Sequence, residues 1–374
     1  MRVLHVIATD QRRGSEVFAA DLIQVLAEAG VSQRVATLHG DGRTGLSYAV
    51  ANSNLPSGGA TLPGLRLDVR TVRGLLWARR QWRPDIIQAH GGEALKYVLA
   101  SSVGRPIPVV YRRIGGSPPW ITRGVRRVAY RRLFGATARI VALAEYVRSE
   151  TLATFDIPPD HVITIPNAVD RERMKTTRDR RDVRRGLEVP DDAPVFLSVC
   201  ALTWEKDPMV HLEVSSRVLN RVSNAHHLVV GDGPMRRDVE EAAKGLGLNG
   251  RIHVLGARSD VADLMATSDA LLFASRADGM EGLPTVLIEA GMVGLPAVAY
   301  DVAGVGEVVV DHQTGFLVPW GHPEGLAEGV IRLMTEPELR AGMGDEARTH
   351  CRERFDIRTV APRYLRLYEE VLAR

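Results

Sequence analysis

The sequence contains few cysteine, lysine and aromatic residues and no long apolar run. Its 374 residues hold two cysteines, Cys200 and Cys351, without a CxxC spacing, so neither a disulfide framework nor a zinc site is indicated. No run approaches the ~18 apolar residues that a membrane-spanning helix needs. The start, Met1 to Ala8, resembles a short strand instead of a signal peptide. These absences predict a reducing compartment and a cytoplasmic protein, or one peripheral to the inner face of the membrane.

The net charge of the chain does not indicate a nucleic-acid partner. A formal net charge of +3 over 374 residues gives only a weak field, so the excess of arginine is interpreted as coding bias and no nucleic-acid partner is expected. Of the 48 basic residues only four are lysine: Lys96, Lys175, Lys206 and Lys244. Because lysine is so scarce, a lysine at a motif position is less likely to stand there by chance.

Short β-branched runs alternate with amphipathic segments along most of the chain. This alternation is typical of parallel strands joined by crossover helices, and the length suits two domains. The fold class predicted is α/β, with two Rossmann-like doubly wound domains that face a central cleft. Strands are expected near 3–8, 34–38, 86–89, 108–112 and 139–143, and then near 195–199, 227–230, 252–255, 270–274, 297–300 and 315–318.

A domain boundary is predicted where the two series meet. The sequence Ile165-Pro-Asn-Ala-Val-Asp170 is followed by a charged stretch, residues 171–185, and proline, asparagine and charge runs favour a linker. We expect an N-terminal domain over 1–170 and a C-terminal domain over 186–355. A helix over 356–374 is expected to pack back on the first domain, because its apolar residues recur every three or four positions.

The segment from Ala274 to Gly291 carries the strongest chemical signal. A strand ends in a glycine-containing loop, and Pro284 is expected in the first turn of the next helix. Backbone N–H groups at such a helix start suit an anion such as a pyrophosphate. Glu281 precedes that turn and Glu289 lies in its second turn, where they can accept hydrogen bonds from sugar or ribose hydroxyls. From spacing alone, Glu289 is equally a solvated helix residue.

Glu281 and Glu289, with Gly-Leu-Pro after the first, resemble the paired-glutamate motif of the retaining family 4 glycosyltransferases of GT-B fold. The resemblance extends over almost the whole chain. It includes Gly231-Asp-Gly-Pro234, Gly256-Ala-Arg-Ser-Asp-Val261, Ala303-Gly-Val-Gly-Glu307 and Thr314-Gly-Phe-Leu-Val-Pro319.

This resemblance implies that the N-terminal domain binds the acceptor and the C-terminal domain binds the nucleotide sugar. It also implies roles for individual residues. Glu281 would hold the transferred sugar, Glu289 the ribose hydroxyls, and Lys206 the leaving phosphate. The remaining donor-binding residues that it implies are Gly282, Leu283, Pro284 and Thr285 at the diphosphate, Gly256 and Arg258 near the base, and Gly233, Gly14 and Ser15 in glycine-rich turns. No cofactor besides the nucleotide diphosphate sugar is expected, and without a convincing DxD-like pair the reaction is expected to need no metal.

Two positions depart from the family pattern. Ala201 stands where an arginine commonly completes a cationic pair with the lysine, and Ile114 stands where many relatives have a histidine near the sugar. His90, at a strand end, is an alternative catalytic group, although it is equally a histidine satisfied by neighbouring backbone. Candidates to replace the arginine are Arg258, Arg276, Arg112 and Arg113, and Arg112, Arg113 and Ile114 are also placed on the acceptor side.

Arginines crowd one predicted helix of the first domain. It could contact an anionic membrane, bind a phosphate on the acceptor, or be a solvated face. The residues are Arg123, Arg126, Arg127, Arg131 and Arg132, with Trp120, Val128, Leu133 and Phe134 nearby. The stretch 41–64, rich in glycine, serine and proline, is expected to form a loop on the acceptor side.

The function predicted is retaining transfer of a sugar from a UDP, GDP or ADP sugar to a hydroxyl acceptor, such as a glycan, a lipid-linked sugar or a natural product. UDP is preferred only because it is the commonest donor nucleotide. Two alternatives remain: a nucleotide-sugar-binding partner protein with little activity, suggested by Ala201 and Ile114, and another GT-B enzyme such as a sugar epimerase.

Overall fold

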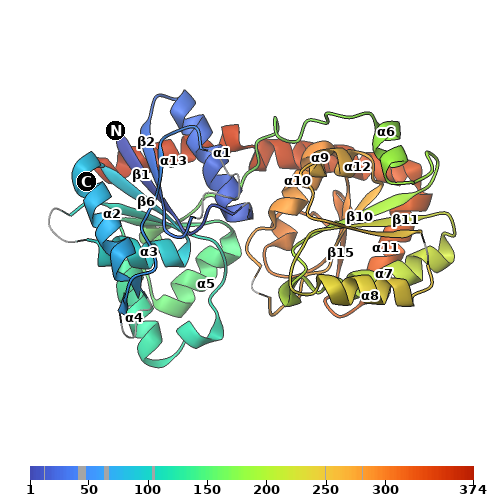
Figure 1. The fold of residues 1–374 in the computed structure, drawn as a ribbon, viewed down its shortest axis with the longest axis horizontal. Coiled ribbons are helices and arrows are strands. Elements are labelled where there is room, and N and C mark those ends of the chain that lie inside the picture. Colours follow the sequence, from blue (N-terminus) through green and yellow to red (C-terminus); the bar gives the residue numbers. More distant parts are fainter. Residues whose placement is uncertain (12, 41–47, 63–66, 103–105, 249, 280) are drawn as a thin grey trace. The chain divides into compact units, whose positions relative to one another are not determined.

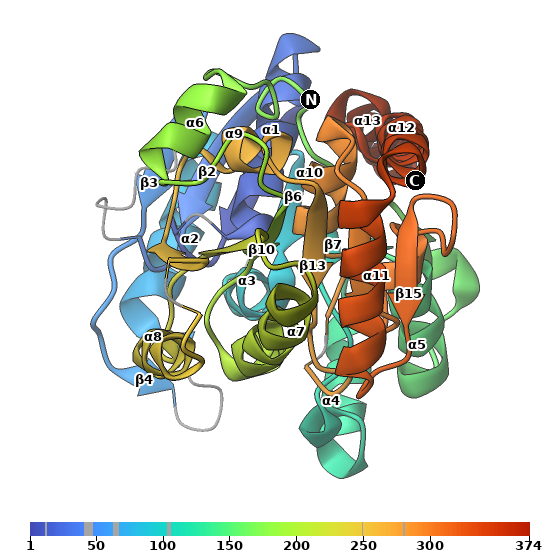
Figure 2. The ribbon, with the colours of Figure 1, turned by 90° about the vertical axis from the view of Figure 1, so that its right-hand side faces the viewer.

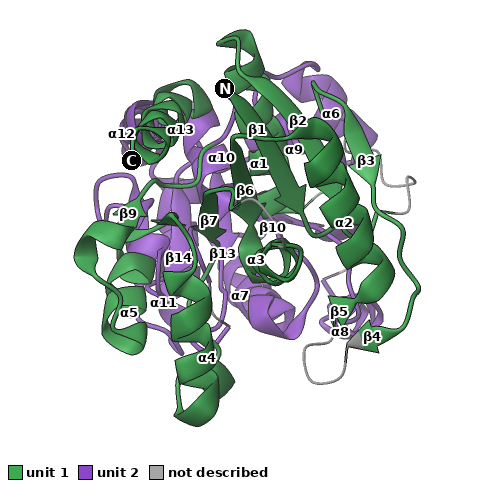
Figure 3. Ribbon diagram, turned by 90° about the vertical axis from the view of Figure 1, so that its left-hand side faces the viewer, with its two compact units in different colours: residues 1–168, 357–374 green, residues 169–356 purple. Residues whose placement is uncertain are grey.

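The computed structural model describes residues 1–11, 13–40, 48–62, 67–102, 106–248, 250–279 and 281–374. They form two compact units: Met1–Ala168 with Ile357–Arg374, and Val169–Asp356 (Figure 3). The charged stretch 171–185 belongs to the second unit and contains helix α6 (Arg180–Gly186). Each unit is a parallel sheet covered by helices (Figure 1).

The first unit has a seven-stranded parallel sheet in the order β3-β2-β1-β6-β7-β8-β9. Its strands are β1 (Arg2–Ile7), β2 (Ser32–Thr37), β3 (Asn52–Asn54), β6 (Ile86–His90), β7 (Val109–Arg113), β8 (Arg139–Ala142) and β9 (Val162–Thr164). The edge strands β3 and β9 were not expected, because each is only three residues long. β3 and the short β4 (Thr61–Leu62), which pairs with β5 (Leu67–Asp68), lie in the stretch expected as a loop. Residues 41–47 and 63–64 of that stretch lie outside the described residues.

The core of the first unit forms where α1 and α13 pack on one face of the sheet. Phe18, Leu22 and Leu26 of α1 recur at helical spacing and are buried with Val3, Ile86 and Val110. Tyr364, Leu367 and Tyr368 of α13 belong to the same cluster, so the C-terminal helix packs on the first unit. The helices are α1 (Gly14–Glu28), α2 (Val69–Trp82), α3 (Gly91–Ala100), α4 (Gly124–Gly135), α5 (Glu145–Phe155) and α13 (Ile357–Leu372).

The second unit has a six-stranded parallel sheet in the order β12-β11-β10-β13-β14-β15. Its strands are β10 (Val195–Val199), β11 (His226–Val230), β12 (Ile252–Gly256), β13 (Ala270–Phe273), β14 (Ala297–Tyr300) and β15 (Gly315–Val318), all where the sequence predicts them. Helices α7 and α11 lie side by side against the sheet (Figure 2). The helices besides α6 are α7 (Pro208–Arg221), α8 (Arg236–Gly245), α9 (Val261–Ala266), α10 (Thr285–Val293), α11 (Pro323–Thr335) and α12 (Pro337–Phe355).

The strand order reverses once in each sheet, between β1 and β6 and between β10 and β13. Open α/β sheets bind ligands beyond the carboxyl ends of the strands at this switch point. Lys206 follows β10 and Glu281 follows β13, whereas Ser15 follows β1 and His90 ends β6. The topology thus brings predicted site residues to the switch point of each sheet.

Candidate active site

Helix α10 begins at Thr285, directly after the loop that follows β13. Pro284, with φ −65° and ψ 111°, is the residue before the helix and not part of its first turn as expected. The difference is one residue, because the extended ψ of Pro284 places it outside the helix. The N–H groups of the first turn of a helix have no partner within it, and the macrodipole adds partial positive charge there. An anion is therefore favoured beside Thr285.

Glu281 and Lys206 form an ion pair beside this helix start. The Glu281 carboxylate oxygen Oε1 accepts from Lys206 Nζ and from Ser275 Oγ, the latter at 2.7 Å. Lys206 lies in a 3-10 turn, Trp204–Lys206, and its Nζ is 5.5 Å from the centre of the Phe273 ring. The Glu281 side chain is only 10% exposed, so the pair is poorly screened by water.

Glu289 is held by an arginine that the sequence analysis missed. Arg173 Nη1 donates to Glu289 Oε1 at 3.0 Å, and the Glu289 side chain is 16% exposed. Glu289 is therefore not the solvated helix residue that spacing alone allowed. Arg173 lies in the charged stretch assigned to a linker, and no local pattern links it to a residue 116 positions away.

The four candidate replacements for the arginine missing at Ala201 occupy very different surroundings. The guanidinium of Arg112 is fully buried in the first unit, donates to Asn167 and lies 3.9 Å from the centre of the Phe18 ring. Arg113, also buried there, pairs with Glu150 at 2.6 Å. Both arginines are thus enclosed by their own unit, and their placement on its acceptor side stays a prediction.

Arg276, by contrast, contacts the turn that carries Lys206. Its backbone N–H donates to Glu205 O at 2.9 Å, and its guanidinium lies 4.7 Å from the Trp204 ring centre and 5.8 Å from that of Trp320. The guanidinium groups of Arg276 and Arg258 both have carboxylate partners: Arg276 pairs with Asp278 at 3.0 Å and with Asp207 at 3.5 Å, and Arg258 pairs with Asp260 at 2.6 Å. Arg276 is placed best to supplement Lys206, because it alone of the four candidates contacts the turn that carries this lysine.

Gly231 and Gly233 are required by close packing of the backbone. A Cβ on Gly231, whose φ is +143°, would lie 1.7 Å from Cys200 O, and one on Gly233 would lie 2.4 Å from Leu202 O. Leu202 N donates to Asp232 O at 2.9 Å in the same contact. These glycines therefore support the segment that leads to Lys206. For Gly233 this is an indirect role, whereas the sequence analysis expected it to bind the donor. Gly256, with φ +66°, is the last residue of β12.

In the first unit, Gly14 and Ser15 open helix α1, where Gly14 is exposed and Ser15 is half-buried. The Ser15 hydroxyl donates to the carboxylate of the next residue, Glu16. Glu16 is buried, and burial raises its pKa above the ordinary value although Ser15 and Arg112 oppose the shift. The turn after β1 thus offers an exposed backbone beside a buried carboxyl group.

His90 belongs to a chain of hydrogen bonds that sets its tautomer. Gln33 Nε2 donates to Ile23 O at 3.0 Å, so Gln33 Oε1 accepts from His5 Nε2 at 2.9 Å. His5 Nδ1 must then accept, at 3.1 Å, from His90 Nε2. Burial lowers the pKa of His5 to about 4 and that of His90 well below its ordinary value, so both rings are neutral at pH 7. His90 Nδ1 is therefore an acceptor, buried and without a hydrogen-bond partner among the described residues.

Ile114 directly follows β7 and is 39% exposed. A Cβ built on Gly91 would lie 3.3 Å from Ile114 Cδ1, so this side chain lies next to the residue after His90. The position where relatives have an imidazole is thus apolar here, with an imidazole from a neighbouring strand close by.

Buried neutral histidines predict that acid destabilises the protein. Burial lowers the pKa of His5 and of His211 from 6.5 to about 4, so between these pH values the unfolded chain binds protons that the folded chain does not. At ~1.4 kcal/mol per pH unit, each would remove about 3 kcal/mol of stability by pH 4. Denaturant midpoints measured from pH 7 to pH 4.5 should fall, and His211→Asn should flatten the profile whereas the exposed-site variant His322→Asn should not. A flat wild-type profile would contradict the assignment.

The arginine-rich segment forms helix α4, as expected, and projects Trp120, Val125 and Val128 toward solvent. Arg131 pairs with Asp156 at 3.0 Å and Arg126 lies over the Trp120 ring, so part of its charge is used within the unit. Contact with an anionic membrane remains a prediction, which cosedimentation with anionic and neutral vesicles measures. None of the helices among the described residues is both long and apolar enough to span a bilayer.

The paired histidines of β11 do not form a metal site. His226 Nδ1 contacts His253 Nε2 at 3.0 Å, whereas His227 contacts Ser198 and Ser215 on the other face of the strand. Across the described ranges, no group of three or more histidine, cysteine, aspartate or glutamate side chains is arranged to hold a metal ion.

Comparison with known proteins identifies the family of the chain. Residues 12–173 match the family model Glycosyltransferase Family 4, and residues 179–350 match Glycosyl transferases group 1. Among similar proteins are an alpha-D-kanosaminyltransferase (26% identity, 79% of this chain and 82% of the relative) and a 2-deoxystreptamine glucosyltransferase (28% identity, 94% and 97%), both from Streptomyces kanamyceticus. Among solved structures is Anabaena HepE in complex with UDP and glucose, with a TM-score of 0.86, 20% identity and coverage of 99% of both chains.

Two parallel-sheet units in one chain, together with these matches, define a glycosyltransferase of GT-B fold. The chain belongs to the family 4 glycosyltransferases, and its second half is a group 1 glycosyl transferase domain. This membership favours sugar transfer over the two alternatives, a binding partner and an epimerase.

Proposed function

We propose that the enzyme moves a sugar from a nucleotide diphosphate sugar to a hydroxyl of its acceptor with retention of anomeric configuration. The observation that carries the proposal is the Lys206–Glu281 ion pair beside the start of α10, at the β10/β13 switch point. UDP is the preferred nucleotide, since HepE is described with UDP and with UDP-glucose. One relative is named as a 2-deoxystreptamine glucosyltransferase, which supports a hydroxyl-rich acceptor.

The ion pair suggests how binding and chemistry are linked. A diphosphate beside Thr285 would compete with Glu281 for the Lys206 ammonium, because phosphate oxygens accept strong charge-assisted hydrogen bonds. Glu281, still bonded to Ser275, could then accept from sugar hydroxyls. Positive charge held in advance beside the leaving phosphate stabilises the charge that grows there in the transition state.

The reaction that we propose breaks the bond from the anomeric carbon to the diphosphate and forms one to the acceptor oxygen on the same face. The acceptor proton passes to the leaving phosphate, so no protein base is required. His90 Nδ1 would accept a hydrogen bond from a substrate hydroxyl, since His5 holds it in the tautomer with a lone pair there. Because Lys206 and the backbone supply positive charge, we expect turnover in the presence of EDTA.

Thermal stabilisation by a panel of nucleotide diphosphates and nucleotide sugars tests the donor. A ligand at 100 times its Kd stabilises by about 2.7 kcal/mol, which a melting experiment resolves. We expect UDP to stabilise the wild type, and Glu289→Gln to weaken this binding by about 10- to 100-fold through the loss of a charge-assisted contact to ribose.

The matched control for this experiment is Glu346→Gln, an exposed glutamate on α12. It should bind UDP as the wild type does. If no nucleotide stabilises the protein, or if both variants bind alike, the assignment of Glu289 to the donor is wrong.

A further inference from the structure

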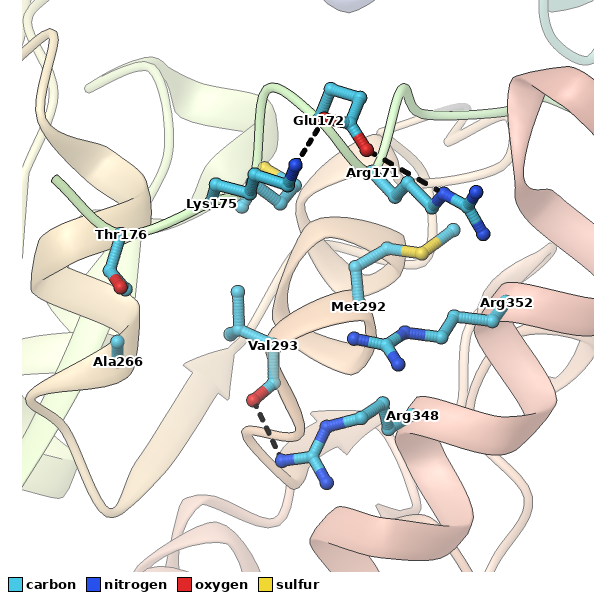
Figure 4. Close-up of a pocket in the computed structure, with 10 residues that line it drawn as sticks. Arg171, Glu172, Lys175, Thr176, Ala266, Met292, Val293, Arg348 and Arg352 are labelled. Carbon is cyan, nitrogen blue, oxygen red and sulfur yellow. Dashed lines mark hydrogen bonds and ion pairs between the residues drawn. The ribbon is translucent and has the colours of Figure 1, made fainter.

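A separate cavity of about 550 Å³ lies in the second unit, where residues 171–176 face α10 and α12 (Figure 4). Its volume is in the range of sites that hold small ligands. Side chains from three parts of the unit converge on it: the chain entering the unit, the end of α10, and α12. The lining residues that matter here are Arg171, Glu172, Lys175, Met292, Arg348 and Arg352.

The lining carries four cations and one carboxylate. Glu172 pairs with Lys175 and lies 3.8 Å from Arg171 Nε, which is also 3.6 Å from Asp356 Oδ2. Arg348 pairs at 2.7 Å with Asp345, which does not line the cavity. Among the described residues, no carboxylate lies within ion-pair distance of Arg352. The cavity therefore has excess positive charge.

Two of the cations lie close together on one helix and extend in the same direction. Arg348 and Arg352 are four residues apart on α12, and Figure 4 shows both guanidinium groups extending toward Met292 and Val293. Like charges at this spacing destabilise a helix by a few tenths of a kcal/mol. An anion between them would remove that repulsion. Arg348 Nη2 also donates to Val293 O at 3.2 Å, which fixes its direction.

Apolar side chains complete the lining and limit the kind of anion. Ala266 and Val293 expose apolar surface beside the guanidinium groups, and the largely buried Met174 and Met292 complete the lining. A bare ion would leave this surface in water, whereas a phosphate ester would place its oxygens on the arginines and its organic part on the apolar surface.

The cavity is distinct from the donor site. It lies at Met292 and Val293, the C-terminal end of α10, whereas the donor diphosphate is placed at Thr285, the N-terminal end. Eight residues of helix separate these ends by about 12 Å. We propose that this cavity is a second, independent ligand site that binds a small organic phosphate.

Its position suggests what the ligand would contact. The chain passes between the units after Ala168 and again after Asp356. Arg171 and Arg352 lie within four residues of these points, and Val169 N donates to Phe355 O at 2.9 Å, which joins the two segments. A phosphate held by Arg171 and Arg352 would therefore bridge both connecting segments within the second unit.

Isothermal titration with phenyl phosphate and with inorganic phosphate tests the proposal, using the full-length protein. We expect phenyl phosphate to bind more tightly, because only it covers the apolar surface. Arg352→Ala should weaken its binding by about 10-fold or more, as the loss of a charged contact implies. Lys175→Gln, also at an exposed position, gives a second variant should the first fold poorly.

Arg354→Ala is the matched control, because Arg354 is exposed on the same helix but does not line the cavity. It should bind phenyl phosphate as the wild type does, and so should Lys206→Ala, which alters the donor site. Absence of saturable binding at millimolar concentrations, or equal binding by Arg352→Ala and Arg354→Ala, would overturn the proposal. Binding that is lost in Lys206→Ala but kept in Arg352→Ala would place the ligand in the donor site instead.

Discussion

Lys206→Ala is expected to lower the rate of acceptor-dependent sugar transfer by about 10²- to 10³-fold. Removal of one preorganised group that stabilises transition-state charge has an effect of this size. Lys206 approaches Glu281 in a region where little water screens the charge, with the Glu281 side chain 10% exposed. The effect should fall on kcat more than on KM, since the leaving phosphate gains charge only as the bond breaks.

Glu281→Gln is expected to give a loss of similar size for a different reason. Glutamine keeps the length of the side chain and an acceptor oxygen for Ser275, but it removes the charge that pairs with Lys206 and that orients sugar hydroxyls. The double variant should lose less than the product of the two single losses, because groups that act as a unit are not additive. The rates of all three variants are measured as release of nucleoside diphosphate with and without acceptor.

The control for this set is Lys244→Ala, an exposed lysine in α8. It removes the same charge from the same unit and should leave the rate unchanged. Circular dichroism and melting temperature show whether each variant is folded. Folded Lys206→Ala or Glu281→Gln protein with wild-type turnover would disprove the mechanism proposed for this site.

Most of the fold could be predicted because local patterns encode it. The eleven expected strands appear within a residue or two of their predicted positions, since each is a short apolar run bounded by turn residues. Short polar edge strands such as Asn52–Asn54 lack that signal, because an edge strand with both faces exposed needs no apolar residues.

The site could be predicted only in part. Glu281, Lys206 and Glu289 belong to motifs with fixed spacing, but the partners of Glu289 and His90 come from distant parts of the chain. Arg173 lies 116 residues from Glu289, and His5 lies 85 residues from His90. The first contact joins a loop to helix α10 and the second joins neighbouring strands, and a single sequence does not specify such packing residue by residue. Sequence also gave no sign that Arg112 and Arg113 are buried, because arginine is usually exposed.

Gly231→Ala is expected to destabilise the second unit by about 3 kcal/mol or more. The new Cβ would lie 1.7 Å from Cys200 O, a backbone atom that cannot rotate away, and the φ of +143° is itself unfavourable for alanine. The backbone must shift to relieve the overlap, and the segment that shifts leads to Lys206. Folded molecules of the variant should therefore also transfer sugar slowly, which a structural defect remote from the site would not cause. Denaturant unfolding and turnover, measured on the same preparation, test both effects.

Gly245→Ala separates this steric explanation from a general intolerance of alanine. Gly245 is the last residue of α8, and a Cβ there would meet no atom within 4 Å. Alanine has the higher helix propensity, so this variant should be unchanged or more stable by up to about 1 kcal/mol. Equal stability and turnover of Gly231→Ala and Gly245→Ala would contradict the steric explanation. Lys206 would then not be positioned by the close packing of the 231–233 turn on residues 200–202. The turn would then have to be assigned a direct role at the donor, as the family resemblance first implied for Gly233.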